Sequence, residues 1–186
     1  MRIFAKAILL ASMIAATGQS AQAQSTIIAE PVDWSAQFAG LDGVAITCIR
    51  TIERNYAERA CQQLMDHAAS ALKKSGIPHV VAGSYYSRDP APEPTSLLAN
   101  PLNLTIHVRA TDPNPLGIDI RMNASVSYTA AVEKHGNTAP RRGELLMWQH
   151  GTTGAGAAQK LEPAIIQASK KRMDVLLGHI DEGWQR

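Results

Sequence analysis

The sequence lacks the patterns that identify several common classes of protein. Beyond residue 23, no apolar segment reaches the roughly 20 residues that a membrane-spanning helix needs. No internal repeat is visible. The chain has only two cysteines, and their spacing is not the Cys-x-x-Cys of a redox-active pair. We therefore expect neither a membrane span in the mature chain nor a thiol-disulfide oxidoreductase.

Motifs that carry catalysis are also missing. No Gly-x-Ser-x-Gly elbow presents a serine nucleophile. The stretch Gly151–Gly156 could offer backbone N–H groups to an anion, but Ala157 and Ala158 stand where the phosphate-binding pattern has Lys and Ser or Thr. We interpret these glycines as a flexible connection that ends one strand and precedes the last helix. The sequence thus gives no specific support to an enzyme, and it indicates no cofactor.

The histidines are scattered singly along the chain. They are His67, His79, His107, His135, His150 and His179. No His-x-His or His-Glu-x-x-His spacing aims two of them at one ion. Only His107 and His150 are expected to share the open face of a sheet. We predict no metal site.

The charge balance argues against nucleic acid as a partner. The chain has 18 basic and 16 acidic residues, and the first 23 residues hold two basic and no acidic ones, which leaves 16 of each sign. A neutral chain has no net field that attracts nucleic acid or anionic lipid.

The N-terminus carries the pattern of a cleavable signal peptide. Arg2 and Lys6 precede an apolar run of about ten residues, the length of a signal-peptide core. Small residues close the segment, so we predict cleavage between Ala23 and Gln24. The alternative is a short amphipathic helix of a cytoplasmic protein, but the polar residues form no helical stripe. No cysteine follows the cleavage site to take a lipid anchor, so we expect a soluble periplasmic or secreted protein.

Cys48 and Cys61 are expected to form a disulfide. A predicted strand continues about 13 Å beyond Cys48 at about 3.3 Å per residue. The next helix begins at Asn55 and returns about 9 Å by Cys61 at about 1.5 Å per residue. A helix folded back over the strand therefore brings the two sulfur atoms level, and closing a loop of this size stabilises by about 3 kcal/mol. The alternative is a pair of buried free thiols.

Hydrophobic periodicity predicts the remaining elements of a single domain over residues 43–186, after an extended lead-in over residues 24–42. The expected elements are strands over 43–52, 79–86, 102–109, 118–129 and 144–150, and helices over 55–75 and 157–180. A proline-rich loop separates the second and third strands. Asp112-Pro113-Asn114-Pro115 joins the third and fourth as a hairpin. The register that pairs apolar with apolar residues sets Arg109 opposite Asp119.

The order strand, helix, four strands, helix predicts an α+β fold, a two-layer sandwich. Its mostly antiparallel sheet of about five strands has two helices packed on one face. The open polar face carries four candidate binding residues, which are His107, Arg109, Arg121 and Asn123. At the level of fold, this topology resembles small bacterial envelope domains that assist outer-membrane or surface assembly.

These observations lead to two hypotheses of function. The first is an exported, non-catalytic accessory or binding protein of the bacterial cell envelope that contacts another envelope protein. The alternative is a periplasmic enzyme or small-ligand-binding protein that uses the open sheet face. A pocket that holds two or more of the four candidate side chains would favour the alternative. The sequence indicates no oligomeric state.

Overall fold

The computed structural model describes residues 33–184, except 53–54, 90–97, 112–115 and 135–136. These residues belong to one compact unit, Val32–Arg186. The predicted signal peptide, the proline-rich segment before residue 98 and the predicted turn at 112–115 lie outside the described residues. None of the helices described has the length and apolarity needed to cross a membrane.

The order of strands and helices is the one that the periodicity predicts. The elements are α1 (Trp34–Phe38), β1 (Gly43–Arg50), α2 (Asn55–Lys74), β2 (His79–Tyr86), β3 (Pro101–Ala110), β4 (Leu116–Lys134), β5 (Asn137–Gly156) and α3 (Ala158–Trp184). Only the short helix α1 is additional. It lies within the lead-in that we expected to be extended, and the Asp33 carboxylate at its start accepts a hydrogen bond from the Ala36 backbone N–H at 3.4 Å.

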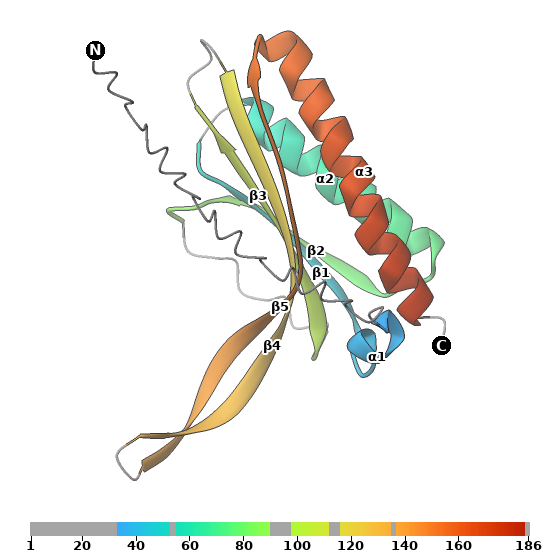
Figure 1. Cartoon of the computed structure of the whole chain (residues 1–186), viewed down its shortest axis with the longest axis vertical. Coiled ribbons are helices and arrows are strands. Elements are labelled where there is room, and N and C mark those ends of the chain that lie inside the picture. Colours follow the sequence, from blue (N-terminus) through green and yellow to red (C-terminus); the bar gives the residue numbers. More distant parts are fainter. Residues whose placement is uncertain (1–32, 53–54, 90–97, 112–115, 135–136, 185–186) are drawn as a thin grey trace, which may run out of the picture. The chain divides into compact units, whose positions relative to one another are not determined.

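The five strands form one mixed sheet in the order β2-β1-β3-β4-β5 (Figure 1). The β3–β4 and β4–β5 ladders are antiparallel, as expected. Strand β1, second from the edge of the sheet, differs, because it pairs in parallel with both β2 and β3. Helix α2 is the crossover that returns the chain to the same end of the sheet, which a parallel β1–β2 pair requires.

The predicted hairpin of β3 and β4 has the register that its apolar pattern implies. Leu104 lies opposite Ala124, and Arg109 lies opposite Asp119. The even-numbered residues Leu102 to Val108 and Leu116 to Ala124 are buried on one face, whereas their odd-numbered neighbours include the polar candidates His107 and Asn123. This alternation assigns one face of the sheet to the core.

The two long helices cover that core face (Figure 1). Helix α2 contacts β1, β2 and β3, and helix α3 contacts β4 and β5. The residues that fill the layer between them include Ile46, Leu64, Ile106, Met122 and Leu176, each less than 2% exposed. A fully buried side chain of this size contributes about 1.5–3 kcal/mol, so this layer dominates the stability of the fold. The two-layer α+β sandwich is confirmed.

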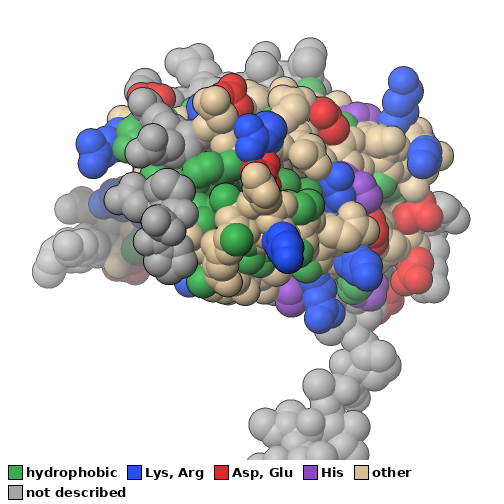
Figure 2. Space-filling view, turned by 90° about the horizontal axis from the view of Figure 1, so that it is seen from above, with side chains coloured by type: hydrophobic (Ala, Val, Ile, Leu, Met, Phe, Trp, Pro, Cys, Tyr) green, Lys and Arg blue, Asp and Glu red, His purple; other side chains and the backbone are tan. Residues whose placement is uncertain are grey.

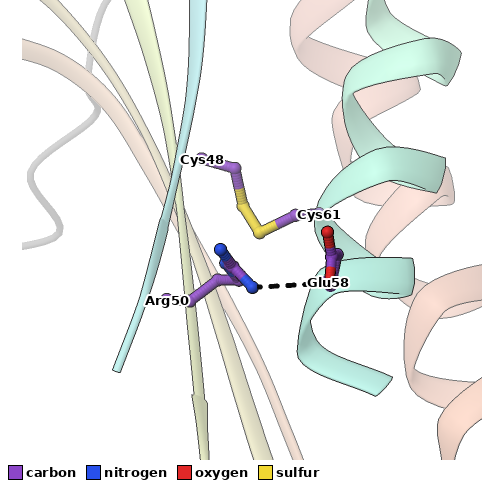
Figure 3. The surroundings of a disulfide bond; sticks show 4 residues. All are labelled: Cys48, Arg50, Glu58 and Cys61. Atoms are coloured by element: carbon purple, nitrogen blue, oxygen red, sulfur yellow. Dashed lines mark ion pairs between the residues drawn. A yellow bond between two sulfur atoms is a disulfide. The ribbon is translucent and has the colours of Figure 1, made fainter. Parts of the chain in front are cut away.

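The predicted disulfide joins β1 to α2. Cys48 and Cys61 are bonded, their Cα atoms lie 5.6 Å apart, and both side chains are fully buried. Figure 3 shows the bond between the strand and the first turns of the helix, beside an ion pair of Arg50 and Glu58 at 3.7 Å. The bond therefore fixes how α2 lies on β1.

The glycine-rich stretch 151–156 does not end the fifth strand, contrary to our interpretation. Strand β5 continues through it to Gly156. A Cβ atom on Gly154 would lie 2.8 Å from Ile165 and 2.9 Å from Leu161 of α3. The absence of a side chain at Gly154 therefore lets the helix approach the strand closely, which is the role of this glycine.

Strands β4 and β5 also extend far beyond the predicted hairpin residues. Pairing between β3 and β4 ends at Val126, whereas β4 and β5 stay paired to Lys134 and Asn137. Residues 127–134 and 137–144 thus form a two-stranded ribbon, here called the arm, which projects beyond the helices (Figure 1).

A bulge in β5 separates the arm from the rest of the sheet. Ala124 pairs with Trp148 but Ser125 pairs with Leu146, so Met147 has no partner in β4. The extra residue reverses which β5 side chains face the helices. Trp148 packs against the core on the helix side, whereas below the bulge Leu145 takes that side, opposite Val126.

Candidate functional site

The helix-free face of the sheet is hollowed into an open groove of about 610 Å³. All five strands contribute to it. Its floor is polar and neutral, and carries Thr47, Asn103, Thr105, His107, Asn123, Ser125 and Ser127. Apolar side chains of β1, β2 and β5 include Ile49, Val80 and Leu146. Arg142 and Glu144 line the end next to the arm. Such a lining can donate and accept hydrogen bonds but carries little net charge.

The structure brings two of the four predicted site residues into this groove. His107 and Asn123 line it. Arg121 lies opposite His107 in the β3–β4 register but lines a neighbouring hollow of about 390 Å³. Arg109 lines a third hollow, of about 400 Å³, at the far end of the hairpin. The four side chains therefore share a face without forming one site.

His107 lies half-buried at one end of the groove floor. Loss of solvent lowers the pKa of its imidazole below the ordinary value of 6.5, and the positive charges of Arg109 and Arg121 lower this pKa further. Both causes favour the neutral form of the ring. A neutral imidazole has one N–H donor and one nitrogen acceptor, so His107 can hydrogen-bond a polar ligand but does not attract an anion.

The Asn123 amide is oriented by a contact across the β4–β5 ladder. Its Oδ1 atom accepts a hydrogen bond from Gln149 Nε2 at 3.1 Å. No partner is described for the Asn123 amide N–H groups within the part of the chain that the structure covers. A fixed amide of this kind can present its two donors to a ligand.

Asp119 forms its ion pair within its own strand. Its carboxylate accepts hydrogen bonds from Arg121 Nε at 3.1 Å and from Thr153 Oγ1 at 2.9 Å. The predicted register of Arg109 opposite Asp119 is confirmed, but the ion pair that the structure describes for Asp119 is the one with Arg121. Residues two apart in a strand point to the same face, which makes this partner available.

His150 does not share the open face with His107, contrary to expectation. It pairs with the buried Met122, and its ring stacks on Trp148 with centroids 6.0 Å apart. Trp148 packs against the core on the helix side. Within the described residues, no group of three or more His, Cys, Asp or Glu side chains is placed to hold a metal ion.

Sequence reasoning missed the contributions of the two strands at the far edge of the groove. Thr47 of β1 and Tyr85 of β2 both line it. Partial burial raises the pKa of the Tyr85 hydroxyl, which therefore stays protonated as a hydrogen-bond donor. The alternation of β3 and β4 marks their polar face in the sequence, but nothing local indicates that β2 lies beside β1 on the same surface.

The surface charge agrees with the near balance of 18 basic and 16 acidic residues in the sequence. Figure 2 shows Lys and Arg side chains interspersed with Asp and Glu over the face in view. Comparison with protein-family models found no match, and neither did comparison with curated proteins, so the groove and its geometry are the basis for assigning a role to this chain.

Proposed function

We propose that this chain is an exported accessory protein of the bacterial cell envelope, and that it binds another envelope protein through the groove on its helix-free face. The observation that carries the proposal is the groove itself, which draws neutral hydrogen-bonding side chains from across the sheet. A long open groove of this kind suits an extended segment of a partner. Each hydrogen bond adds about 0.5–1.5 kcal/mol, so binding would depend on several of them together.

Two features support the location outside the cytoplasm. The N-terminal sequence has the charged, apolar and small-residue regions of a signal peptide. The bond between Cys48 and Cys61 is of the kind that persists in oxidising compartments. Mass spectrometry of the protein isolated from its native host tests the location, with a periplasmic or secreted chain that begins at Gln24 as the expected result. An intact chain in the cytosol that retains Met1 would contradict it.

The groove favours a non-catalytic role. No hydrogen bond is described between His107 and a groove hydroxyl. A nucleophile activated by a base needs such a contact. Asp119, which lies on the same face outside the groove lining, is already paired with Arg121. Binding is therefore the function that these residues support best.

A small polar ligand is the second candidate. It is favoured by one observation, that His107 and Asn123 lie in the same groove with donors and acceptors available. Native mass spectrometry of protein from the host envelope would reveal a bound small molecule. Loss of that molecule in both His107→Ala and Asn123→Ala would support this candidate over a protein partner.

A blocking substitution tests the proposed groove. Ser127 lines the groove and is exposed, so Ser127→Arg places a long side chain in it. Thr129→Arg is the matched control, because Thr129 is also exposed, lies on the same face of β4 and is outside the groove lining. Envelope proteins captured by the wild type should be lost with Ser127→Arg and retained with Thr129→Arg. Equal recovery with both variants would place the binding surface elsewhere.

A further inference from the structure

The two faces of the arm differ in chemistry. The face that continues the helix-covered side of the sheet carries Tyr128, Ala130, Val132 and Ala139, with Leu145 at its base. The opposite face is mostly polar, with Ser127, Thr129, Glu133, Thr138, Arg142 and Glu144, and its two apolar residues are the facing pair Ala131 and Pro140. A ribbon with this alternation normally buries its apolar face. The first of these surfaces is called the apolar arm face below.

The apolar arm face is exposed. Tyr128 is 50%, Val132 43% and Leu145 55% exposed. Helices α2 and α3 cover the same side of the sheet but do not extend over the arm (Figure 1). An isolated two-stranded ribbon is only marginally stable in water, and packing against a helix is one way to stabilise it.

We propose that the apolar arm face binds an amphipathic α-helix of another protein, with acidic residues beside its apolar stripe. The first argument is continuity. Val126 packs against the core, and Tyr128, Ala130 and Val132 follow it at the same two-residue spacing. The sheet therefore offers a helix the same kind of surface on the arm that it offers α3 further along β4 and β5.

Charge selects the kind of helix. Arg141 lies opposite Ala130 on the apolar arm face and is exposed. No ion pair of Arg141 is described, and the acidic side chains of the arm, Glu133 and Glu144, lie on its other face. A partner that supplies a carboxylate next to its apolar stripe would complete this surface.

The same charge argues against a second copy of this chain as the occupant. Two apolar arm faces packed together would place both Arg141 side chains in one interface that contains no acidic residue. Like charges brought together in an interface oppose association.

A lipid surface fits less well than a helix. Among the described strands, none pairs with the other edge of β4 beyond Val126, and β5 is the last strand of the sheet. Insertion of the arm into hydrocarbon would leave the backbone groups along both edges unpaired, at a cost of several kcal/mol for each group. A helix laid on one face leaves both edges in water.

Adjacent residues of β5 supply matched variants. Leu145 and Leu146 are 55% and 51% exposed but point to opposite faces, as do Arg141 and Arg142. The probe is a synthetic helical peptide with an apolar stripe flanked by Glu, and its counterpart has Lys in place of Glu. Leu145→Ser should weaken binding of the Glu peptide at least about tenfold, and Leu146→Ser should not. Arg141→Glu should transfer the preference to the Lys peptide, whereas Arg142→Glu should leave it unchanged.

Circular dichroism of each variant separates loss of binding from loss of folding, and the Arg141→Glu exchange gives a gain of binding that misfolding cannot mimic. In native cells, a photocrosslinking residue at position 145 should label an acidic amphipathic segment of a different protein. One at position 146, which lines the groove, should not label that segment, whatever the groove itself binds. The proposal is overturned if the wild type binds neither peptide or if position 145 labels a second copy. The proposal also fails if the wild type binds phosphatidylglycerol vesicles and Leu145→Ser abolishes that binding, because the apolar arm face would then be a lipid-binding surface. The groove on the opposite face is tested by Ser127→Arg, so either proposal can fail alone.

Discussion

The ring of Tyr128 in β4 lies over Gly143 of β5. A Cβ atom at Gly143 would come within 2.6 Å of the Tyr128 Cζ and Oη atoms, and the two residues are paired in the ladder. The aromatic ring thus occupies the space that the glycine leaves on the apolar arm face. This contact couples the two strands of the arm beyond the region that β3 supports.

Gly143→Ala should therefore disturb the arm and leave the core intact. The added methyl group displaces the Tyr128 ring, so faster amide hydrogen exchange is expected in residues 127–144 than in the wild type. The melting temperature should change little because the core side chains lie elsewhere.

A double substitution serves as the control for that prediction. Replacing Tyr128 with Ala removes the ring that the new methyl group meets. Gly143→Ala should then have a much smaller effect on exchange in the Tyr128→Ala background than in the wild type. Equal effects in both backgrounds would mean that the ring and the glycine are not coupled.

Gly154→Ala should destabilise the domain as a whole. The new Cβ atom meets the Cδ1 atoms of Ile165 and Leu161 at less than 3 Å, so these two side chains must repack, or α3 must move away from β5. Overpacking of this kind costs about 1–3 kcal/mol of unfolding free energy, measurable by urea denaturation. Gly151→Ala is the matched control, because its Cβ atom would have no neighbour closer than 3.8 Å. A loss of stability as large in the control would contradict close packing at Gly154 as the cause.

Loss of the disulfide should lower the free energy of unfolding by about 3 kcal/mol, because the bond closes a loop between two cysteines that lie 13 positions apart in the sequence. The Cys48→Ala/Cys61→Ala double variant tests this by chemical denaturation. Thiol labelling of the unfolded, unreduced wild type should detect no thiol in this pair. Labelling of two thiols would show that the bond is absent from the protein as made.

His107 should make the domain less stable in mild acid. The pKa of His107 is lowered in the folded state, chiefly by loss of solvent, so the unfolded chain takes up this proton first as the pH falls below 6.5. The free energy of unfolding should therefore decrease as the pH falls from 6.5 through the folded-state pKa of His107, because in this range the unfolded chain binds more protons than the folded one. His107→Gln should show a smaller decrease in melting temperature over this interval than the wild type.

The arginines provide an internal check on that pH dependence. Arg109→Gln removes one of the positive charges that lower the pKa of His107. An NMR titration of the His107 ring should show that this pKa rises in the variant. It should not reach the ordinary value, because desolvation, the larger cause, is unchanged. No change in the titration would show that the charge of Arg109 does not act on the ring.

Much of the core could be predicted because alternation is a local signal. The apolar residues of β3 and β4 repeat every second position, and this repeat assigns their faces and their register together, including Arg109 opposite Asp119. The position of Asn55 and the period of α2 likewise place Cys61 near Cys48. These predictions needed only neighbouring elements of the chain.

The remaining features depend on contacts that no local pattern encodes. The sequences of β1 and β3 do not show whether the two strands pair in parallel or antiparallel, because a strand has the same alternation of side chains in either kind of pair. The fifth strand was expected to begin at Glu144, yet backbone pairing with β4 carries Pro140 and Gly143 within β5. The groove also includes Thr47 of β1 and Tyr85 of β2, beside the polar face of β3 and β4. Their position depends on the order of the strands in the sheet, which no local pattern gives.

The unpaired Met147 divides β5 into two segments. In one segment the even-numbered side chains face the helices, and in the other the odd-numbered ones do. Adding or removing facing pairs of residues at the tip of the hairpin would change its reach without altering which side chains enter the core above Met147. Deleting Met147 itself would give the whole strand one continuous alternation of side chains. Either the residues of the arm or those of the core segment would then have to exchange their two faces. The hairpin is thus an appendage whose length can be adjusted separately from the sandwich that carries it.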